Sequence, residues 1–247
     1  IMEVIDEKID ITDENAKDIA VAKGEIEFDH VSFAYPEAGE NVLTDISFKA
    51  KKGQTIAVIG STGSGKSTLI NLIPRYYDVT KGSVKVDGVD VRDMTQKELR
   101  DKLGYVPQKG VLFSGTIDSN IRYGKPEITD AQVKEAAEVA QATEFIDTKP
   151  EKYESPVSQG GTNVSGGQKQ RLSIARAIAK DPEIFIFDDS FSALDFKTDS
   201  QLRKALKEYT KDATTVIVAQ RISTILGADQ IIVLDDGHTV SYTHLRA

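Results

Sequence analysis

One short glycine-rich motif constrains the fold of this chain more than any other feature of its sequence. It fits the pattern G-x-x-x-x-G-K-[ST] and consists of Gly60, Ser61, Thr62, Gly63, Ser64, Gly65, Lys66 and Ser67, with Thr68 directly after it. Residues 55–59 before it have the length and apolar character of a buried strand, and residues 66–74 are predicted to be helical. A strand, a glycine-rich loop and a helix in this order predict a phosphate-binding loop in an α/β fold.

Each part of this loop has an expected role in binding a polyphosphate. The glycines allow backbone N–H groups to turn toward the phosphates, and the helix N-terminus adds partial positive charge. We expect Lys66 to contact the outer phosphates and the Ser67 hydroxyl to ligate Mg²⁺. The alternative is a chance glycine-rich turn, which the flanking strand and helix argue against.

A second ligand for Mg²⁺ is expected at the end of another buried strand. Residues 184–187 read Ile-Phe-Ile-Phe, and Asp188 follows them directly. Four apolar residues before an Asp are by themselves more often a plain strand end. In a chain that carries a phosphate loop, they predict that this carboxylate holds Mg²⁺ directly or through water.

The order of predicted elements divides the chain into regions. Strand-like segments are predicted at 25–34, 41–50, 55–59, 82–91 (a hairpin turning at Asp87-Gly88) and 103–106. Residues 117–146 change to a helical period, with helices predicted at 120–123, 131–140 and 144–147, which indicates a second lobe. Helices and strands then alternate as in a parallel sheet, with helices at 168–180, 198–209 and 222–226 and strands at 184–187, 214–218 and 231–234.

The composition excludes several classes of protein. The formal net charge of −8 at pH 7 disfavours nucleic acid as a partner, because neutralising phosphates needs clustered Lys and Arg. The chain has no Cys and three scattered His, so neither a disulfide framework nor a zinc cluster is expected. No apolar run approaches the roughly 18 residues that a membrane-spanning helix needs.

A second glycine-rich motif narrows the family. It consists of Ser165, Gly166, Gly167 and Gln168, and in isolation it reads as a capped helix start aimed at an anion. Together with the phosphate loop and Asp188, it gives a chain that resembles the ATP-binding domain of ABC transporters from residue 25 to about 237. The resemblance implies an α/β fold, with a P-loop (RecA-like) core and mostly parallel sheet, an antiparallel β subdomain, and a helical subdomain at about residues 109–180.

Other positions match the same family. Tyr35 corresponds to the aromatic residue on which adenine stacks, and Gln108 to the glutamine that meets Mg²⁺ and hinges the helical subdomain. Residues 192–195 match the loop that touches the opposite subunit, and residues 111–117 are typical of exporters. In such proteins two ATP-binding domains form a head-to-tail dimer. Each ATP lies between the phosphate loop of one domain and the Ser-Gly-Gly-Gln segment of the other, here called the signature segment.

Two catalytic positions depart from the usual pattern of the family. Asp189 stands where most members have the Glu that polarises the attacking water, and Gln220 stands where most have a His that contacts the γ-phosphate. Asp is one methylene shorter, which withdraws the carboxylate by roughly 1.5 Å. An amide can donate a hydrogen bond but cannot carry a positive charge. The pair resembles the degenerate site of heterodimeric ABC exporters.

The expected protein is therefore the ATP-binding subunit of an ABC exporter, with ATP and Mg²⁺ as cofactors. Its own site is expected to be slow or inactive, and its signature segment is expected to complete the hydrolysing site of a different chain. The resemblance also implies a transmembrane domain as partner and a location at the cytoplasmic face of the cell membrane. The alternatives are a hydrolytic homodimer, a regulatory domain in which ATP keeps the dimer closed and is never hydrolysed, and a soluble ABC ATPase of translation or DNA repair.

The two ends of the chain are expected to differ from its middle. Residues 1–24 read as a linker from an upstream transmembrane domain that the chain does not contain, and residues 25–247 as the ATPase domain. Residues 241–247 fit the family poorly, so no function is assigned to this tail.

Overall fold

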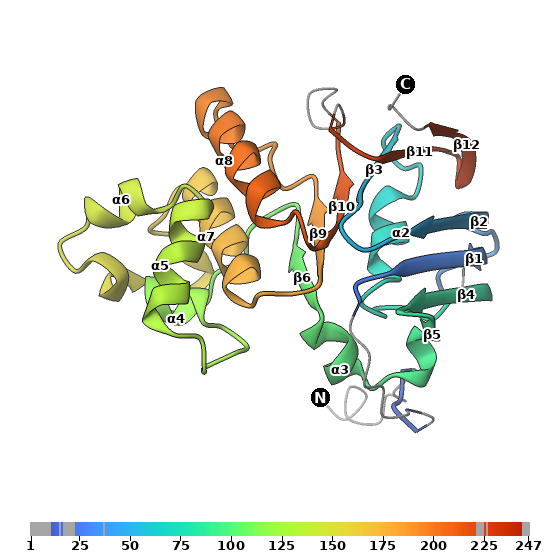
Figure 1. Ribbon diagram of the computed structural model, residues 1–247, viewed down its shortest axis with the longest axis horizontal. Coiled ribbons are helices and arrows are strands. Elements are labelled where there is room, and N and C mark those ends of the chain that lie inside the picture. Colours follow the sequence, from blue (N-terminus) through green and yellow to red (C-terminus); the bar gives the residue numbers. More distant parts are fainter. Residues whose placement is uncertain are drawn as a thin grey trace.

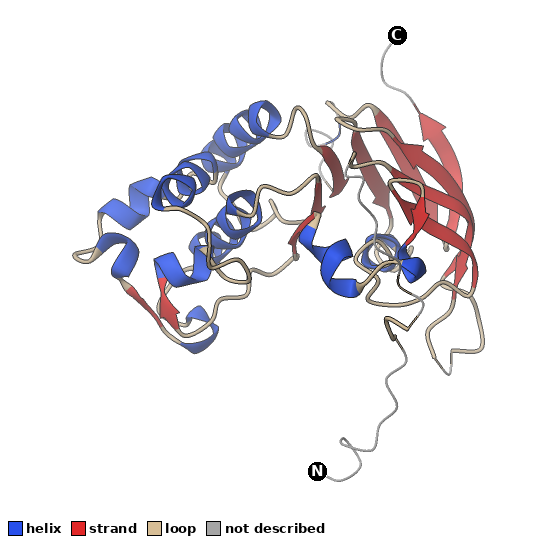
Figure 2. Cartoon of the chain, turned by 60° about the horizontal axis from the view of Figure 1, so that its bottom comes forward, coloured by secondary structure: helices blue, strands red, loops and turns tan. Residues whose placement is uncertain are grey.

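A computed structural model describes residues 11–14, 16, 23–36, 38–220, 225 and 227–243 of the 247-residue chain. Its strands form two main sheets, and a helical lobe lies beside them (Figure 1). Figure 2 separates these parts by colour, with most of the helices on one side and most of the strands on the other.

The larger sheet positions the site. Its six strands have the order β12-β11-β3-β10-β9-β6, and all except the edge strand β12 run parallel. The strands are β3 (Thr55–Gly60), β6 (Leu103–Val106), β9 (Ile184–Asp188), β10 (Thr214–Val218), β11 (Gln230–Asp235) and β12 (His238–Thr243). Because the carboxyl ends of parallel strands lie at one edge, the loops after β3, β6, β9 and β10 come together.

The smaller sheet is antiparallel and has the order β2-β1-β4-β5. Its strands are β1 (Ile26–Phe33), β2 (Leu43–Ala50), β4 (Lys81–Val86) and β5 (Val89–Asp90). Asp87 and Gly88 join β4 to β5 with φ angles of 54° and 81°. Two positive φ angles in a two-residue hairpin are the mark of a type I′ turn, which favours Gly at its second position.

The helical lobe comes from the middle of the chain. Its elements are β7 (Gly115–Thr116), α4 (Ile117–Ile121), α5 (Asp130–Val139), α6 (Thr143–Asp147), the 3₁₀ turns η2 (Lys152–Glu154) and η3 (Gln159–Gly161), β8 (Pro156–Val157) and α7 (Gly166–Ala179). Outside it lie α2 (Lys66–Asn71), η1 (Val91–Asp93), α3 (Gln96–Asp101) and α8 (Phe196–Tyr209). Thr116, Thr129 and Ser165 each begin a helix with a reciprocal capping box.

Strand β9 is shared by the two main apolar clusters. Ile184 and Ile186 pack into the cluster that joins both sheets and α2, whereas Phe185 and Phe187 pack into the cluster of the helical lobe and α8. Successive side chains of a strand point to opposite faces, so one strand contributes to both. Its final residue is Asp188, at the carboxyl end of the strand.

The predicted fold class is confirmed: the fold is α/β, with a mostly parallel sheet, an antiparallel sheet and a helical lobe. Some boundaries are wrong. The helix predicted to reach residue 74 ends at Asn71, because the backbone N–H groups of Leu72 and Ile73 bond to the carbonyls three residues back, as in a 3₁₀ turn. Pro74 follows, and its ring disfavours a helical conformation at the residue before it. The helix predicted at residues 120–123 begins at Ile117, where the Thr116 capping box starts it. Helix α3 was not predicted.

Three expectations fall wholly or partly outside the described residues. Of the helix expected at 222–226, only Ile225 is described, and residues 1–10, 15 and 17–22 of the expected linker are not. The described part of the linker includes Asp13, whose carboxylate accepts a hydrogen bond from the backbone N–H of Gln96 at 3.1 Å. Backbone residues 241–243 of the expected tail belong to β12, and residues 244–247 are not described. None of the helices in the described ranges is long and apolar enough to cross a bilayer.

Candidate functional site

The glycine-rich loop folds tightly between β3 and α2. The Lys66 ammonium donates to the backbone carbonyls of Gly60 at 2.9 Å and Ser61 at 2.6 Å. A Cβ at Gly65, whose φ is 96°, would lie 2.8 Å from Leu43 Cδ2. A Cβ at Gly60 would lie 2.2 Å from the backbone oxygen of Leu234. Both positions therefore require glycine, and the loop curls around the lysine ammonium.

A hollow of about 290 Å³ opens beside this loop. Lys66 and Gln220 both line it, and the described residues around it are Ile59, Gly60, Ser61, Thr62, Lys66, Ala219, Gln220 and Ile225. The glycine-rich loop thus borders a space next to the end of β10. A single cation and several polar groups around such a space suit an anion.

Ser67 and Asp188 meet at the start of α2. The Ser67 hydroxyl donates to Asp188 Oδ1 at 3.0 Å, and the Asp188 side chain is buried while Ser67 is exposed. Burial raises the pKa of the Asp188 carboxyl, the charge of Asp189 adds to the rise, and the Ser67 hydrogen bond and the Lys66 charge oppose it. A nearby cation would stabilise the charged form of this carboxylate.

The donor atoms at Ser67 and Asp188 fit Mg²⁺. Both are hard oxygen ligands, which Mg²⁺ prefers, and it commonly takes only one or two carboxylates in addition to phosphates and water. Within the described ranges no group of three or more His, Cys, Asp or Glu could hold a metal ion by itself. The predicted Mg²⁺ would therefore depend on a polyphosphate for its other ligands.

Two amides donate to the carboxylate of Asp189. Gln220 Nε2 lies 2.8 Å from Asp189 Oδ2, and Gln108 Nε2 lies 3.4 Å from the same oxygen. The backbone of Asp189 is held too, since its N–H donates to the Val218 carbonyl at 3.1 Å and its φ is 45°. Residues that follow β6, β9 and β10 are thus brought together at one carboxylate.

Two buried polar residues support the segment that carries Gln108. Gln170 accepts from the backbone N–H of Gly110 at 2.9 Å and donates to the Pro107 carbonyl at 3.0 Å. The Ser190 hydroxyl donates to the Val106 carbonyl at 2.8 Å. Neither residue was predicted. Gln170 could have been found from its position, because it lies on the same face of α7 as the buried Ile174 and Ala177.

Tyr35 reaches the first turn of α2. Its hydroxyl lies 2.9 Å from Thr68 Oγ1, and its ring packs edge-on against that of Phe33, with ring centroids 4.9 Å apart. The ring is partly buried. Tyr35 therefore borders the glycine-rich loop, although its predicted contact with adenine stays a prediction.

The signature segment lies apart from these residues. Ser165 caps α7 in the helical lobe, with its Oγ accepting from the backbone N–H of Gln168 at 3.3 Å, and Ser165 and Gly166 are exposed. Gly167 instead approaches the loop after β9, since a Cβ there would lie 3.5 Å from the Ala193 carbonyl. The predicted site residues therefore fall into two clusters. One consists of the glycine-rich loop, Asp188, Asp189, Gln108, Gln220 and Tyr35, and the other consists of the four signature residues.

Comparison with known proteins gives a family match over more than half of the chain. The family model described as ABC transporter matches residues 43–192. A putative multidrug export ATP-binding/permease protein of Staphylococcus aureus strain NCTC 8325 / PS 47 is 46% identical over 241 residues, which are 97% of this chain and 42% of that protein. The corresponding protein of the bovine strain RF122 / ET3-1 is 45% identical over the same length. The chain thus spans about two fifths of the length of these curated relatives.

A solved structure is similar over almost the whole chain. It is described as a bacterial Atm1-family ABC exporter with ATP bound, and it superposes with a TM-score of 0.93 at 37% identity. The match covers 99% of this chain and 43% of that one.

Proposed function

Since this chain belongs to the ABC transporter family, we propose that it is the ATP-binding domain of an exporter whose own catalytic site is degenerate. One observation supports the catalytic part of the proposal: the amides of Gln220 and Gln108 both donate to Asp189 Oδ2. The carboxylate that would polarise water is thus short and already engaged by two hydrogen-bond donors. ATP would bind here and turn over slowly or not at all.

ATP is proposed to bind at the glycine-rich loop. The β- and γ-phosphates would replace the loop carbonyls as partners of Lys66, and residues 60–68 would supply backbone N–H groups and hydroxyls. The ATP bound to the similar Atm1-family structure supports this assignment. Ser67, Asp188 and Gln108 would hold Mg²⁺, which neutralises phosphate charge when it is bound.

Replacing Lys66 with Ala is expected to raise the Kd for Mg-ATP about 10- to 100-fold, because a charged donor to the phosphates is lost. Isothermal titration calorimetry of the wild-type chain and the Lys66→Ala variant measures the change in Kd. Lys169→Ala serves as the matched control, since Lys169 lies on α7 and away from the loop. An unchanged Kd in Lys66→Ala would show that ATP does not use this loop.

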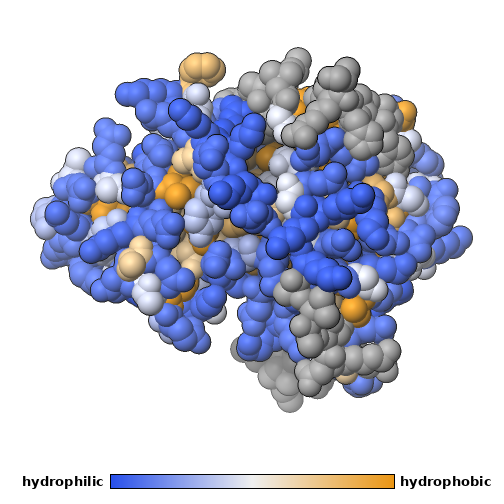
Figure 3. All heavy atoms as spheres, in the orientation of Figure 1, coloured by the Kyte–Doolittle hydropathy of each residue, from blue (hydrophilic) through white to orange (hydrophobic). Residues whose placement is uncertain are grey.

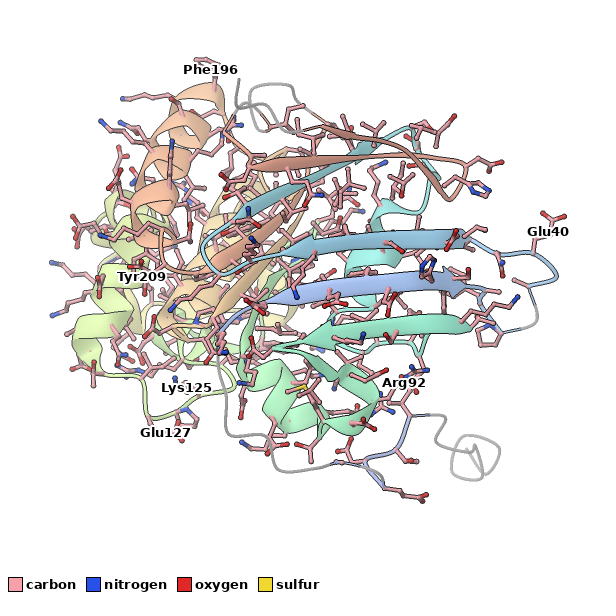
Figure 4. The ribbon with its side chains drawn as sticks, turned by 45° about the vertical axis from the view of Figure 1, so that its right-hand side comes forward. Glu40, Arg92, Lys125, Glu127, Phe196 and Tyr209 are labelled. Carbon is pink, nitrogen blue, oxygen red and sulfur yellow. The ribbon has the colours of Figure 1, made fainter. Side chains whose placement is uncertain are left out.

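A second ATP-binding domain, from a different chain, is the proposed partner in a head-to-tail dimer. The exposed Ser165 and Gly166 would contact the partner's ATP, opposite the partner's phosphate loop. Phe196 directly follows the loop at residues 192–195, is 83% exposed and points away from the body of the domain (Figure 4). An exposed aromatic ring at the start of α8 fits a protein contact.

The transmembrane domain of the exporter is proposed to dock on the helical lobe. Val111, Phe113 and Tyr123 are exposed there, and the rings of Phe113 and Tyr123 stack with centroids 4.1 Å apart. The surface is otherwise mostly hydrophilic in the view of Figure 3. In this arrangement residues 1–24 are the linker, the domain begins at residue 25 with a helical subdomain at about 109–180, and the domain lies at the cytoplasmic face of the membrane.

A further inference from the structure

Three aromatic rings form a cluster beside the glycine-rich loop. The Tyr35 ring stands nearly perpendicular to Phe33, at 81° and 4.9 Å, and to Tyr77, at 89° and 5.1 Å. Phe33 and Tyr77 also contact each other at 5.4 Å. Phe33 is 2% exposed and belongs to the core, whereas Tyr77 is 37% exposed. Tyr77 is therefore the member of the cluster that closes it at the surface.

These contacts determine how the Tyr35 ring is held. Its hydroxyl is tied to Thr68 on α2. Its ring packs edge-on against Phe33, the last residue of β1, and against Tyr77, in the segment between α2 and β4. Perpendicular aromatic pairs have a preferred geometry, so two of them restrict the plane of the ring. Phe33 cannot move without disturbing the core, which leaves Tyr77 as the contact that a substitution can remove selectively.

We propose that Tyr77 is a positioning residue for the nucleobase: it holds the plane of the Tyr35 ring on which adenine would pack. The inference rests on the proposed ATP site and on the predicted contact of Tyr35 with adenine. Tyr77 itself need not touch the base. Its loss should therefore weaken the binding of nucleotides and leave the binding of a polyphosphate without a base unchanged.

The adjacent Tyr76 is a matched control. It is 42% exposed, similar to Tyr77, but its ring packs against Tyr105 at 5.7 Å and under the Arg100 guanidinium at 5.3 Å. A Tyr76→Ala substitution removes an equally exposed ring from the same segment without touching Tyr35. Tyr77→Phe keeps the ring and removes only the hydroxyl.

The experiment compares the binding of Mg-ATP and Mg-tripolyphosphate to the full chain by calorimetry. Tyr77→Ala is expected to raise the Kd for ATP about three- to tenfold and to leave the Kd for tripolyphosphate unchanged. Tyr77→Phe and Tyr76→Ala are expected to match the wild type for both ligands. Tyr77→Leu keeps the apolar volume but has no aromatic edge. If the Ala variant does not fold, the same rise in the Kd for ATP is expected for Tyr77→Leu.

A Tyr35→Ala background separates this inference from the proposed function. There, adding Tyr77→Ala is expected to have no further effect on ATP binding, because the ring that Tyr77 positions is gone. Equal losses for ATP and tripolyphosphate, or a Tyr77 effect that persists without Tyr35, would overturn the inference. The inference would also be overturned if Tyr77→Ala binds ATP with the wild-type Kd while Tyr35→Ala binds it weakly. In that case the proposed contact of Tyr35 with adenine would still stand. If Tyr35→Ala alone binds ATP normally, the adenine contact fails and the inference fails with it.

Discussion

Replacing Asp189 with Glu and Gln220 with His in the same chain is expected to raise the rate of ATP hydrolysis about 10²-fold. A general base contributes about 10²–10⁴ in rate, and a misplacement near 1 Å can cost on the order of 10². Glu would extend the carboxylate by the missing methylene, and His would replace the amide that now donates to Asp189 Oδ2 at 2.8 Å. Phosphate release under saturating Mg-ATP measures the gain.

The controls for this variant separate catalysis from binding and assembly. Each single substitution is expected to recover less than the pair, since Asp189 and Gln220 are in direct contact and their effects couple. Lys66→Ala in the double variant should abolish the gain. Sedimentation in ATP, at the concentration used for the assay, shows whether the chains dimerise equally. A double variant that dimerises like the wild type and releases phosphate no faster would contradict the degenerate site.

Replacing Arg176 with Ala is expected to lower the free energy of unfolding by about 3 kcal/mol. Its guanidinium donates to the backbone carbonyls of Asn120 at 2.8 Å and Val111 at 2.9 Å, and to Asn120 Oδ1 at 3.1 Å. It also lies 5.4 Å from the ring centroids of both Phe113 and Tyr123. Burial lowers the pKa of Arg176 to about 10, so a charged group is kept here at a desolvation cost that these contacts offset.

Urea unfolding of the wild type and the Arg176→Ala chain tests this value. Lys97→Ala is the control, because Lys97 forms an exposed pair with Asp101 at 2.7 Å and should change stability by about 0.5 kcal/mol or less. Arg176→Lys keeps the charge but loses the planar fork, so an intermediate loss is expected. A loss below about 1 kcal/mol in Arg176→Ala would mean that the network does not stabilise the helical lobe.

Local signals predicted most of the fold. The run Ile-Phe-Ile-Phe before Asp188 marks β9, and the Ser165 capping box marks the start of α7, because strand period and helix caps depend on neighbours in sequence. The element that was not predicted lacks a strong local signal. Helix α3 has only six residues, too few for a helical period to stand out, although Thr95 and Glu98 form a capping box.

The arrangement of the site could be predicted only in part. The motifs indicated that Ser67 and Asp188 belong to one site. The parallel sheet explains why these residues meet although they are 121 residues apart in sequence, because Ser67 follows the carboxyl end of β3 and Asp188 ends β9. The contact of Gln220 with Asp189 and the packing of Tyr77 on Tyr35 depend on side-chain orientation, which sequence periodicity does not contain. The same is true of the buried polar support from Gln170 and Ser190.

The most direct test of the central claim is to follow ATP binding and phosphate release by the wild-type chain in the same sample of Mg-ATP. We expect ATP to bind and phosphate to be released well below about 1 per second, the lower end of ordinary enzyme turnover. Release above about 1 per second would contradict the degenerate site, and a hydrolytic homodimer would then be the better description of this domain.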